Sequence, residues 1–300
     1  MRLPDGVLGM TSRGPDWAAW VDRLPALVRG LYDEWQLRPD GWMRHGYCAL
    51  VVPVVTARGA RAVLKVSFPE PESEHEHLAL SHWGGRGAVA LLRADPHRRA
   101  LLLEALRDVS LREAWDVEAC TAVGELYGSL HIPAFNQLRL LSDRTAAAAD
   151  ALATLPRSAP LPRRLVEQAV ALARDFATDA ATNGTLVHTD LHYDNVLLDE
   201  AGDWRAIDPK PLSGDPHYEV TPMLWNRFEE LDGDVRAGVR RRFHTIIDTA
   251  GLDEERARDW VVVRMLDLAA QRILGPPVQR AVPDEQWLTL CVTIAKAVQD

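Results

Sequence analysis

The stretch 186-LVHTDLHYDNVLLDEAGDWRAIDPKP-211 carries two histidines, five aspartates, a glutamate, an asparagine and a lysine around two short apolar runs. The runs VLL and WRAI predict two β-strands, and Gly202 between them supplies a turn position with positive φ. The predicted hairpin brings its two ends together, and these ends carry Asn195 and Asp208. Amide carbonyl and carboxylate oxygens are hard ligands that suit Mg²⁺, so the pair predicts a magnesium site.

Asp190 lies in the predicted loop five residues before Asn195. It is close enough to share the site without having to bind the metal, which is the position that a base activating a hydroxyl group needs. His188, Asp190 and Asn195 fit the spacing H-x-D-x-x-x-x-N. Together with a hairpin and a metal-binding Asp208, this spacing is the layout of a kinase catalytic loop. The stretch therefore predicts phosphoryl transfer, with Asp190 as the catalytic base.

The length and composition of the chain limit the classes of protein to which it can belong. A chain of 300 residues with 47% apolar residues can bury a substantial core, and we expect two packed units. A net charge of −9 argues against nucleic-acid binding, which requires a basic face. No apolar run approaches the length of a membrane span, and the first residues lack a signal-peptide pattern. Three widely spaced cysteines favour a reducing compartment, so we expect a cytoplasmic protein.

The order of the predicted elements defines the fold class. A helix is expected at 16–37, and β-branched runs at 47–56 and 60–68 predict a hairpin. A helix ending near Trp83 and two apolar runs at 88–93 and 99–104 complete a strand-rich first third. The remainder is predicted to be mostly helical, at 109–131, 139–155, 161–181, 217–231, 233–250, 253–273 and 284–299. This order predicts an α+β fold with two lobes, 1–105 and 106–300, joined by one short connection.

Lysine is rare in this chain, because only Lys65, Lys210 and Lys296 stand among 34 basic residues. A kinase site requires a lysine on the strand that covers the nucleotide phosphates, and a glutamate on the next helix that holds this lysine. Lys65 lies in the predicted strand AVLKVSF, and the next helix begins with SEHEHLAL. We predict that Lys65 binds the phosphates, with Glu76 as its partner and Glu74 as the alternative.

The apolar strand ALLLEAL at 100–106 runs into the boundary between the lobes. We expect its backbone around Glu104 to Leu106 to hydrogen-bond the edge of an adenine base. The cofactors that this set of residues predicts are ATP and Mg²⁺.

LVHTDLHYDNVLL followed by AIDPKPLSGDP resembles the aminoglycoside phosphotransferase family within the protein-kinase-like fold. It is most similar to the branch that groups streptomycin 6-kinases with hydroxyurea phosphotransferases. The resemblance covers most of the chain and includes AVLKVSF, HEHLALSHWGGRGAVALL, RRALLLEAL and PHYEVTPMLWNRF. It implies a bilobal fold with a small β-rich N-lobe and a larger helical C-lobe. It also implies transfer of the γ-phosphoryl group of ATP, with Mg²⁺, to a hydroxyl group of a small molecule.

The resemblance assigns a role to each matching residue. It implies a catalytic base at Asp190, metal ligands at Asn195 and Asp208, and a phosphate-binding lysine at Lys65 paired with Glu76. The chain departs from the protein-kinase pattern in two places. The loop expected over the phosphates, RHGYCALVV, has Gly46 alone in place of GxGxxG. The Asp-Phe-Gly step is replaced by Asp-Pro-Lys, so no mobile activation loop is expected.

A metal-dependent hydrolase is one alternative. His188, Asp190, His192 and Asp194 alternate like metal ligands, and HEH at 75–77 adds two histidines. On a helix, however, positions 75 and 77 point to well-separated sides, and no further histidine cluster completes a zinc site. We therefore interpret His188 as a structural residue that hydrogen-bonds the loop backbone. Lys210 either reaches the transferred phosphate or a neighbouring carboxylate, or is a solvated loop cation.

Acidic residues after the hairpin allow two interpretations. They either surround a cationic acceptor or form a solvated face; they are Asp215, Glu219, Glu229, Glu230, Asp232 and Asp234. Trp225 and Phe228 are expected on one helix, in the core rather than in a substrate site.

The acceptor is left open by the sequence. Streptomycin-like aminoglycosides, hydroxyurea and amino sugars are all admissible small-molecule acceptors. An inactive binding module with a kinase fold is the alternative of another class. The complete set of Lys65, Asp190, Asn195 and Asp208 favours an enzyme.

Overall fold

The structure is a computed structural model that describes residues 2–231, 233–275 and 284–299. Contacts among these residues divide the chain into two compact units. The first comprises residues up to 108 together with 198–203, and the second comprises 109–197 and the residues from 204 onward. The chain therefore passes between the units at 108/109, 197/198 and 203/204, and not through the single connection expected from the sequence.

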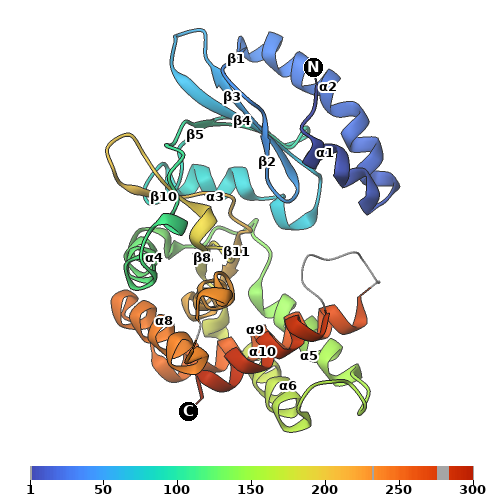
Figure 1. The fold of residues 1–300 in the computed structure, drawn as a ribbon, viewed down its shortest axis with the longest axis vertical. Helices are drawn as coiled ribbons and strands as arrows, with labels where there is room; N and C mark the ends of the chain where they lie inside the picture. Colours follow the sequence, from blue (N-terminus) through green and yellow to red (C-terminus); the bar gives the residue numbers. More distant parts are fainter. Residues whose placement is uncertain (1, 232, 276–283, 300) are drawn as a thin grey trace. The chain divides into compact units, whose positions relative to one another are not determined.

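The first unit is built on an antiparallel sheet with the order β1-β3-β4-β6-β5, in which β2 also pairs with β3 (Figure 1). Its strands are β1 Arg38–Pro39, β2 Arg44–His45, β3 Ala49–Val55, β4 Arg61–Ser67, β5 Leu91–Asp95 and β6 Ala100–Glu104. Its helices are α1 Asp5–Gly9, α2 Pro15–Trp35 and α3 Glu76–Trp83, with 3₁₀ turns η1 Met10–Arg13 and η2 Pro71–Ser73. The predicted hairpin is confirmed as β3 and β4.

The side chains of β3 and β4 point alternately to the two faces of the sheet. Successive side chains of a strand point to opposite faces of the sheet. Leu50 and Val52 of β3, and Leu64 and Val66 of β4, are fully buried in one core with α2. Lys65 lies between the last two and therefore points to the opposite face.

Helix α2 covers this core because its apolar residues recur at helical spacing. Pro15 lies in its first turn, where a missing N–H costs nothing, and Gln36 ends it in the left-handed conformation. The buried side chains of the helix lie along one stripe: Trp20, Val21, Leu24, Val28, Leu31 and Trp35.

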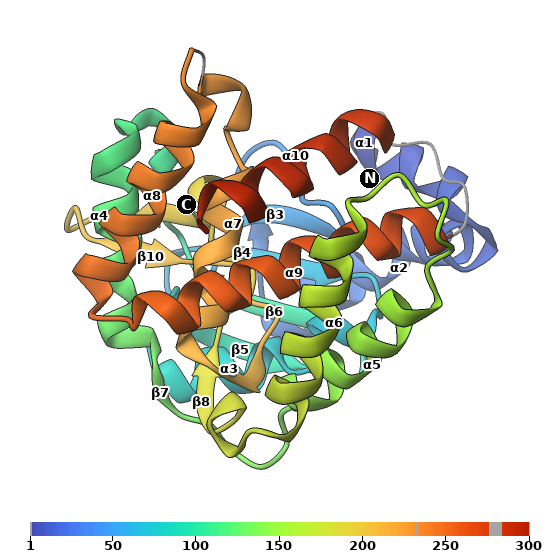
Figure 2. The same cartoon turned by 90° about the horizontal axis from the view of Figure 1, so that it is seen from below.

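The second unit is mostly helical. Its helices are α4 Asp116–Leu130, α5 Leu141–Thr154, α6 Arg163–Thr178, α7 Thr221–Trp225, α8 Val235–Ala250, α9 Glu254–Leu274 and α10 Asp284–Ala297. Its 3₁₀ turns are η3 Leu111–Glu113, η4 Ala180–Thr182, η5 Tyr193–Asn195, η6 Pro216–Val220 and η7 Phe228–Glu230. Helix α9 packs against α5, α6 and α10 (Figure 2).

Residues 186–211 form several short strands. β7 Ile132–Pro133, β8 Thr185–Val187 and β11 Leu212–Gly214 form a small antiparallel sheet with β8 at its centre. The predicted hairpin is confirmed as β9 Val196–Leu198 and β10 Trp204–Ala206. Val187 and Leu212 are buried with Phe176 and Trp260, whose rings stack at 4.0 Å. The helical core thus holds the strands from which the loops of the stretch emerge.

The continuous helix predicted at 217–231 is wrong. The chain forms η6, α7 and η7 instead, with Asn226 extended and Arg227 in the left-handed conformation at φ 54°. The buried Arg242 guanidinium donates to the carbonyls of Met223, Asn226 and Arg227, which replaces the hydrogen bonds that a continuous helix would make. Phe228 therefore leaves the helix of Trp225, and both side chains are only half-buried.

Other boundaries differ by less. The helix predicted from 109 begins at Asp116, because Ser110 caps η3 and bridges to Leu197 before it. Helix α1 and the strands β8 and β11 had no counterpart in the prediction.

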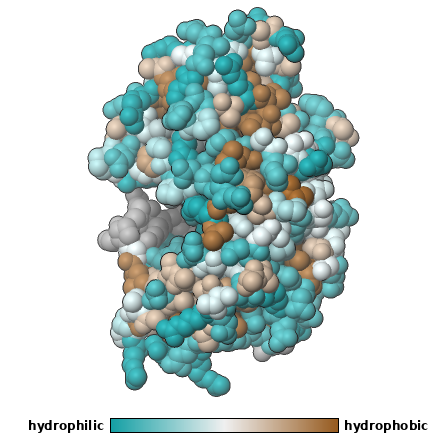
Figure 3. Space-filling model, turned by 180° about the vertical axis from the view of Figure 1, so that it is seen from behind, coloured by the Kyte–Doolittle hydropathy of each residue, from teal (hydrophilic) through white to brown (hydrophobic). Residues whose placement is uncertain are grey.

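Hydrophilic side chains cover most of the face seen in Figure 3, with hydrophobic ones scattered among them. Within the described ranges, every helix is too short or too polar to span a bilayer.

Candidate active site

Two loops of the second unit lie side by side, one at 188–195 and one at 207–211. The β8–β11 ladder continues past its last pair, because the Lys210 N–H donates to the His188 carbonyl at 2.9 Å. The Ile207 N–H donates to the Asn195 carbonyl at 2.9 Å, and the Thr189 hydroxyl donates to the Lys210 carbonyl at 2.7 Å. These bonds bring the predicted loop residues and Asp208 into one site, as the hairpin argument expected.

His188 is fully buried and joins the two loops. Its Nε2 donates to the Ile207 carbonyl at 2.9 Å, and its Nδ1 accepts the Asp190 N–H at 3.2 Å. Burial lowers the pKa of His188, which keeps the ring neutral. Its interpretation as a structural residue is confirmed.

Asp190 follows Thr189, whose φ of 64° turns the chain sharply at this point. Burial raises the pKa of the Asp190 carboxyl, although the neighbouring His192 and His188 act in the opposite direction. A desolvated carboxylate binds a proton more readily than one in water, and this is what a general base requires.

Asn195 and Asp208 place oxygen atoms that could bind a metal ion at the two ends of the hairpin. The Asn195 Nδ2 donates to the Asp190 carbonyl at 2.8 Å, so its side chain is oriented by its nitrogen while Oδ1 keeps its lone pairs for a cation. Asp208 has φ 56°, and its Oδ1 lies 3.2 Å from Lys210 Nζ. This carboxylate and amide set fits the hard-ligand preference of Mg²⁺. Lys210 is therefore a partner of Asp208 rather than a fully solvated cation.

The alternating histidines and aspartates do not gather around one point. Among the described residues, no group of three or more His, Cys, Asp or Glu side chains could hold a metal ion. Both ring nitrogens of His188 bond the backbone, and Asp194 accepts two hydrogen bonds from Arg112 at 2.8 and 3.1 Å. The hydrolase alternative thus finds no ligand cluster in this part of the chain.

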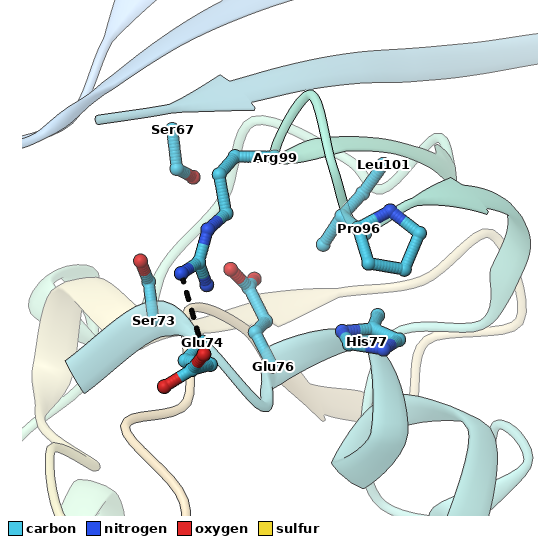
Figure 4. A pocket seen from close by; sticks show the side chains of 8 residues that line it. All are labelled: Ser67, Ser73, Glu74, Glu76, His77, Pro96, Arg99 and Leu101. Atoms are coloured by element: carbon cyan, nitrogen blue, oxygen red, sulfur yellow. Dashed lines mark ion pairs between the residues drawn. The ribbon is translucent and has the colours of Figure 1, made fainter. Parts of the chain in front are cut away.

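Lys65 and Glu76 meet inside the first unit. Lys65 Nζ lies 2.6 Å from Glu76 Oε1, and the two residues are 6% and 3% exposed. Glu74, the alternative partner, lies instead 3.8 Å from Arg99, at the side of a small pocket that Glu76 also lines (Figure 4). Because Lys65 is the residue of β4 that points away from the α2 core, α3 can place Glu76 beside it.

Glu104 and Leu106 mark the end of β6. The Glu104 N–H donates to the Ala90 carbonyl at 3.0 Å, and its Oε1 accepts the Ala90 N–H at 2.7 Å. Arg107 donates its N–H to the Leu198 carbonyl at 2.8 Å. Leu106 lies outside any helix or strand, between these two anchored residues.

Glu219 and Arg264 support the loop and were missed as functional residues. One carboxylate oxygen of the fully buried Glu219 accepts the Thr189 N–H, and the other lies 3.0 Å from His131 Nε2. The buried Arg264 donates to the carbonyls of Thr189 and Tyr218. Burial alone would raise the pKa of Glu219, but the bond to His131 and the nearby His188 hold it below its ordinary value. A signal was present for Arg264, which stands in the apolar run VVVRML.

The acidic residues after the hairpin do not form one ring. Asp215 is buried and bonds His217, Arg256 and Trp260, so it and Glu219 are structural. Glu230 pairs with Arg227 at 2.5 Å, and Asp234 caps α8. Glu229 is exposed, and Asp232 lies outside the described residues. Because their side chains are buried, Asp215 and Glu219 belong neither to a solvated face nor to an exposed ring around an acceptor.

The comparisons with known proteins identify the family of the chain. The family model described as aminoglycoside/hydroxyurea antibiotic resistance kinase matches residues 34–273. The chain belongs to this kinase family. The kinase is 38% identical over 278 residues to the streptomycin 6-kinase of Streptomyces griseus, covering 89% of each chain. It is 40% identical over 289 residues to the hydroxyurea phosphotransferase of Kitasatospora aureofaciens, covering 93% of the kinase and 81% of that relative.

Solved structures show the same fold. A thermostable mutant of an aminoglycoside phosphotransferase, solved with ADP and hygromycin B, matches with a TM-score of 0.60 at 16% identity, over 90% of the kinase and 97% of that chain. The choline kinase of Streptococcus pneumoniae matches with a TM-score of 0.60 at 11% identity, over 93% and 99%. The predicted protein-kinase-like α+β fold and the predicted class of enzyme, a phosphotransferase acting on hydroxyl groups of small molecules, are confirmed.

Replacing Glu219 should destabilise the kinase strongly. In Glu219→Ala, the buried Thr189 N–H and the His131 ring lose their partner, and we expect a loss of about 3–5 kcal/mol in the free energy of unfolding, measured with urea. The control Glu229→Ala removes an exposed glutamate of the same unit and should change it by at most about 0.5 kcal/mol. Equal effects of the two variants would contradict the structural role of Glu219.

Proposed function

We propose that this kinase transfers the γ-phosphoryl group of ATP to a hydroxyl group of a streptomycin-like aminoglycoside. The observation that carries the proposal is the 38% identity to a streptomycin 6-kinase over 89% of both chains, in a chain that keeps Lys65, Asp190, Asn195 and Asp208. Because ATP is a cytoplasmic substrate, we place the reaction in the cytoplasm.

Asp190 acts on the acceptor. Its carboxylate accepts the proton of the acceptor hydroxyl while that oxygen forms a bond to the γ-phosphorus, and the bond from this phosphorus to the bridging oxygen breaks to release ADP. The raised pKa of Asp190 supports this role, because a base of higher pKa takes the proton more readily. The bond from the Asn195 amide to the Asp190 carbonyl fixes the backbone from which the base extends.

The residues of the first unit act on the nucleotide. Lys65 donates to phosphate oxygens, and Glu76 orients its ammonium group, which their 2.6 Å ion pair supports. The backbone from Glu104 to Leu106 bonds the adenine edge. The Glu104 N–H already donates to the Ala90 carbonyl. We therefore assign the Leu106 N–H as the donor to the adenine and the Glu104 carbonyl as the acceptor.

Asn195 Oδ1 and the Asp208 carboxylate would hold Mg²⁺ together with phosphate oxygens. When bound, the ion neutralises the negative charge that develops on the phosphoryl group and the leaving ADP. Lys210 balances the charge of Asp208 from 3.2 Å and would have to share this carboxylate with the ion.

A second acceptor is hydroxyurea. The 40% identity to a hydroxyurea phosphotransferase over 93% of the chain favours it specifically. An assay that couples ADP release to a colour change decides between the two, with streptomycin, hydroxyurea and an amino sugar as acceptors. Streptomycin-dependent ADP release, with a phosphorylated product seen by mass spectrometry, is expected. ADP release that no acceptor stimulates would overturn the proposal.

Asp190→Asn should abolish most of the turnover. The amide keeps the size of the side chain but cannot take up the hydroxyl proton, so kcat should fall by about 10²–10⁴-fold. ATP binding, followed by calorimetry with a nonhydrolysable analogue, should change little. A variant with the turnover of the unmodified kinase would remove Asp190 from the mechanism.

Lys65→Arg should raise the ATP KM although it keeps the charge. The planar guanidinium is larger than the ammonium, and the site beside Glu76 is only 3–6% exposed, so the fork does not fit. Kinetics at varied ATP and saturating acceptor test this expectation. The control is Arg61→Lys, the opposite exchange at an exposed position of the same strand. Unchanged ATP kinetics in Lys65→Arg would make Lys65 a structural residue.

Salt distinguishes the two acceptors. Exposed carboxylates such as Glu229 would attract a polycationic aminoglycoside. Salt screens this attraction over about 8–10 Å at ordinary ionic strength, so the KM of the aminoglycoside should rise from low to moderate salt. Glu229→Gln should raise it as well, whereas Glu255→Gln, at an exposed position on α9, should not. A flat salt profile would favour the neutral hydroxyurea and leave the catalytic residues unaffected.

A further inference from the structure

The loop of residues 45–48 joins β2 to β3, ahead of the strand that carries Lys65. The Gly46 N–H donates to the Ala49 carbonyl at 3.0 Å, which closes the turn. Tyr47 at its tip is 75% exposed. The loop has one glycine where the protein-kinase pattern has three, so contacts with neighbouring residues must define its position.

Arg13 contacts the loop from η1. Its guanidinium lies 4.1 Å from the ring centre of Tyr47, and its Nη1 donates to the Tyr47 carbonyl at 2.5 Å. On its other side, it lies 4.8 Å from the ring centre of Trp17, which stacks on Phe68 at 3.7 Å. The Phe68 N–H in turn donates to the Cys48 carbonyl at 2.7 Å. The loop is thus held at Tyr47 and again at Cys48.

Helix α1 contacts the loop at a second point. The His45 ring lies directly against Gly6, where an added Cβ would come within 2.0 Å of Nε2 and 2.5 Å of Cε1. Gly9 ends the same helix and has open space around its Cα. The absence of a side chain at Gly6 is therefore what lets His45 occupy its position.

The segment 3–14 that makes these contacts is itself anchored. Leu3, Val7 and Met10 are buried in the core between α2 and the sheet. Figure 1 shows α1 beside β2. The segment precedes residues 34–273, the part that matches the family model.

We propose that the segment 3–14 holds the 45–48 loop in the conformation that binds the ATP phosphates, and that Arg13 is its positioning residue. This inference rests on the proposed function, since it assigns the loop to ATP. The glycine of the loop does not fix its conformation. The segment does so, because Arg13 contacts the tip of the loop and Gly6 contacts His45 at the end of β2. Loss of either contact frees the loop and weakens ATP binding without touching Asp190.

Two matched pairs of variants test the proposal in the full chain. Arg13→Ala is compared with Arg29→Ala, at an exposed position on α2, and Gly6→Ala is compared with Gly9→Ala on the same helix. Arg13→Lys keeps the charge but loses the planar stacking between two rings, so it should lie between Arg13→Ala and the unmodified kinase. Amide hydrogen exchange of residues 44–50 is measured without nucleotide, and ATP KM, acceptor KM and kcat are measured in the coupled assay.

Arg13→Ala and Gly6→Ala should speed amide exchange in the loop and raise the ATP KM on the order of 3- to 10-fold, with kcat and acceptor KM nearly unchanged. Arg29→Ala and Gly9→Ala should change none of these. Unchanged exchange in Arg13→Ala and Gly6→Ala would overturn the support of the loop. Faster exchange with an unchanged ATP KM would overturn its role in ATP binding. An unmodified chain that does not use ATP would overturn the proposed function, and exchange would still decide whether the segment holds the loop.

Discussion

The second unit depends on one residue in the left-handed conformation. Thr189 is β-branched, and such residues adopt positive φ at a cost of about 1–3 kcal/mol. Its N–H is bound by Glu219, its carbonyl by Arg264, and its hydroxyl donates to Lys210. Because the backbone reverses direction here, His188 turns inward to Ile207 while Asp190 follows the bend. The strain is maintained by buried charges, and the position of Asp190 follows from it.

Buried charged groups in both units are bound by ion pairs or by backbone carbonyls, as the cost of desolvation requires. Lys65 forms an ion pair with Glu76 in the first unit. In the second unit, Glu219 is hydrogen-bonded to His131, and Arg264 to two backbone carbonyls. A buried ion pair adds little net stability but is costly to break, so it holds its two side chains in one arrangement. The positions of Lys65 and of the loop that carries Asp190 are therefore set without a bound substrate.

The sequence was sufficient where a local pattern sets the structure. The β-branched run AVLKVSF predicted the strand that carries Lys65, and Gly202 between two apolar runs predicted the hairpin that brings Asn195 and Asp208 together. The sequence was insufficient where the local structure depends on a side chain that is distant along the chain. Arg242 ends a helix that the pattern around Trp225 favours, and Glu219 lies 30 residues from the Thr189 that it binds. The strands β8 and β11 were missed because they pair with each other and with β7, and not with a neighbouring strand across a short turn. The catalytic roles themselves remain predictions.

The tip of the β9–β10 hairpin, residues 198–203, belongs to the first unit although the sequence on both sides belongs to the second. The Leu198 carbonyl accepts the N–H of Arg107, at the point where the first unit ends. A fragment cut after Asp108 would therefore lack part of its own unit, and the complementary fragment would carry a tip with no unit to join. An exchange of sequence between relatives at this boundary would therefore divide the first unit between two parents.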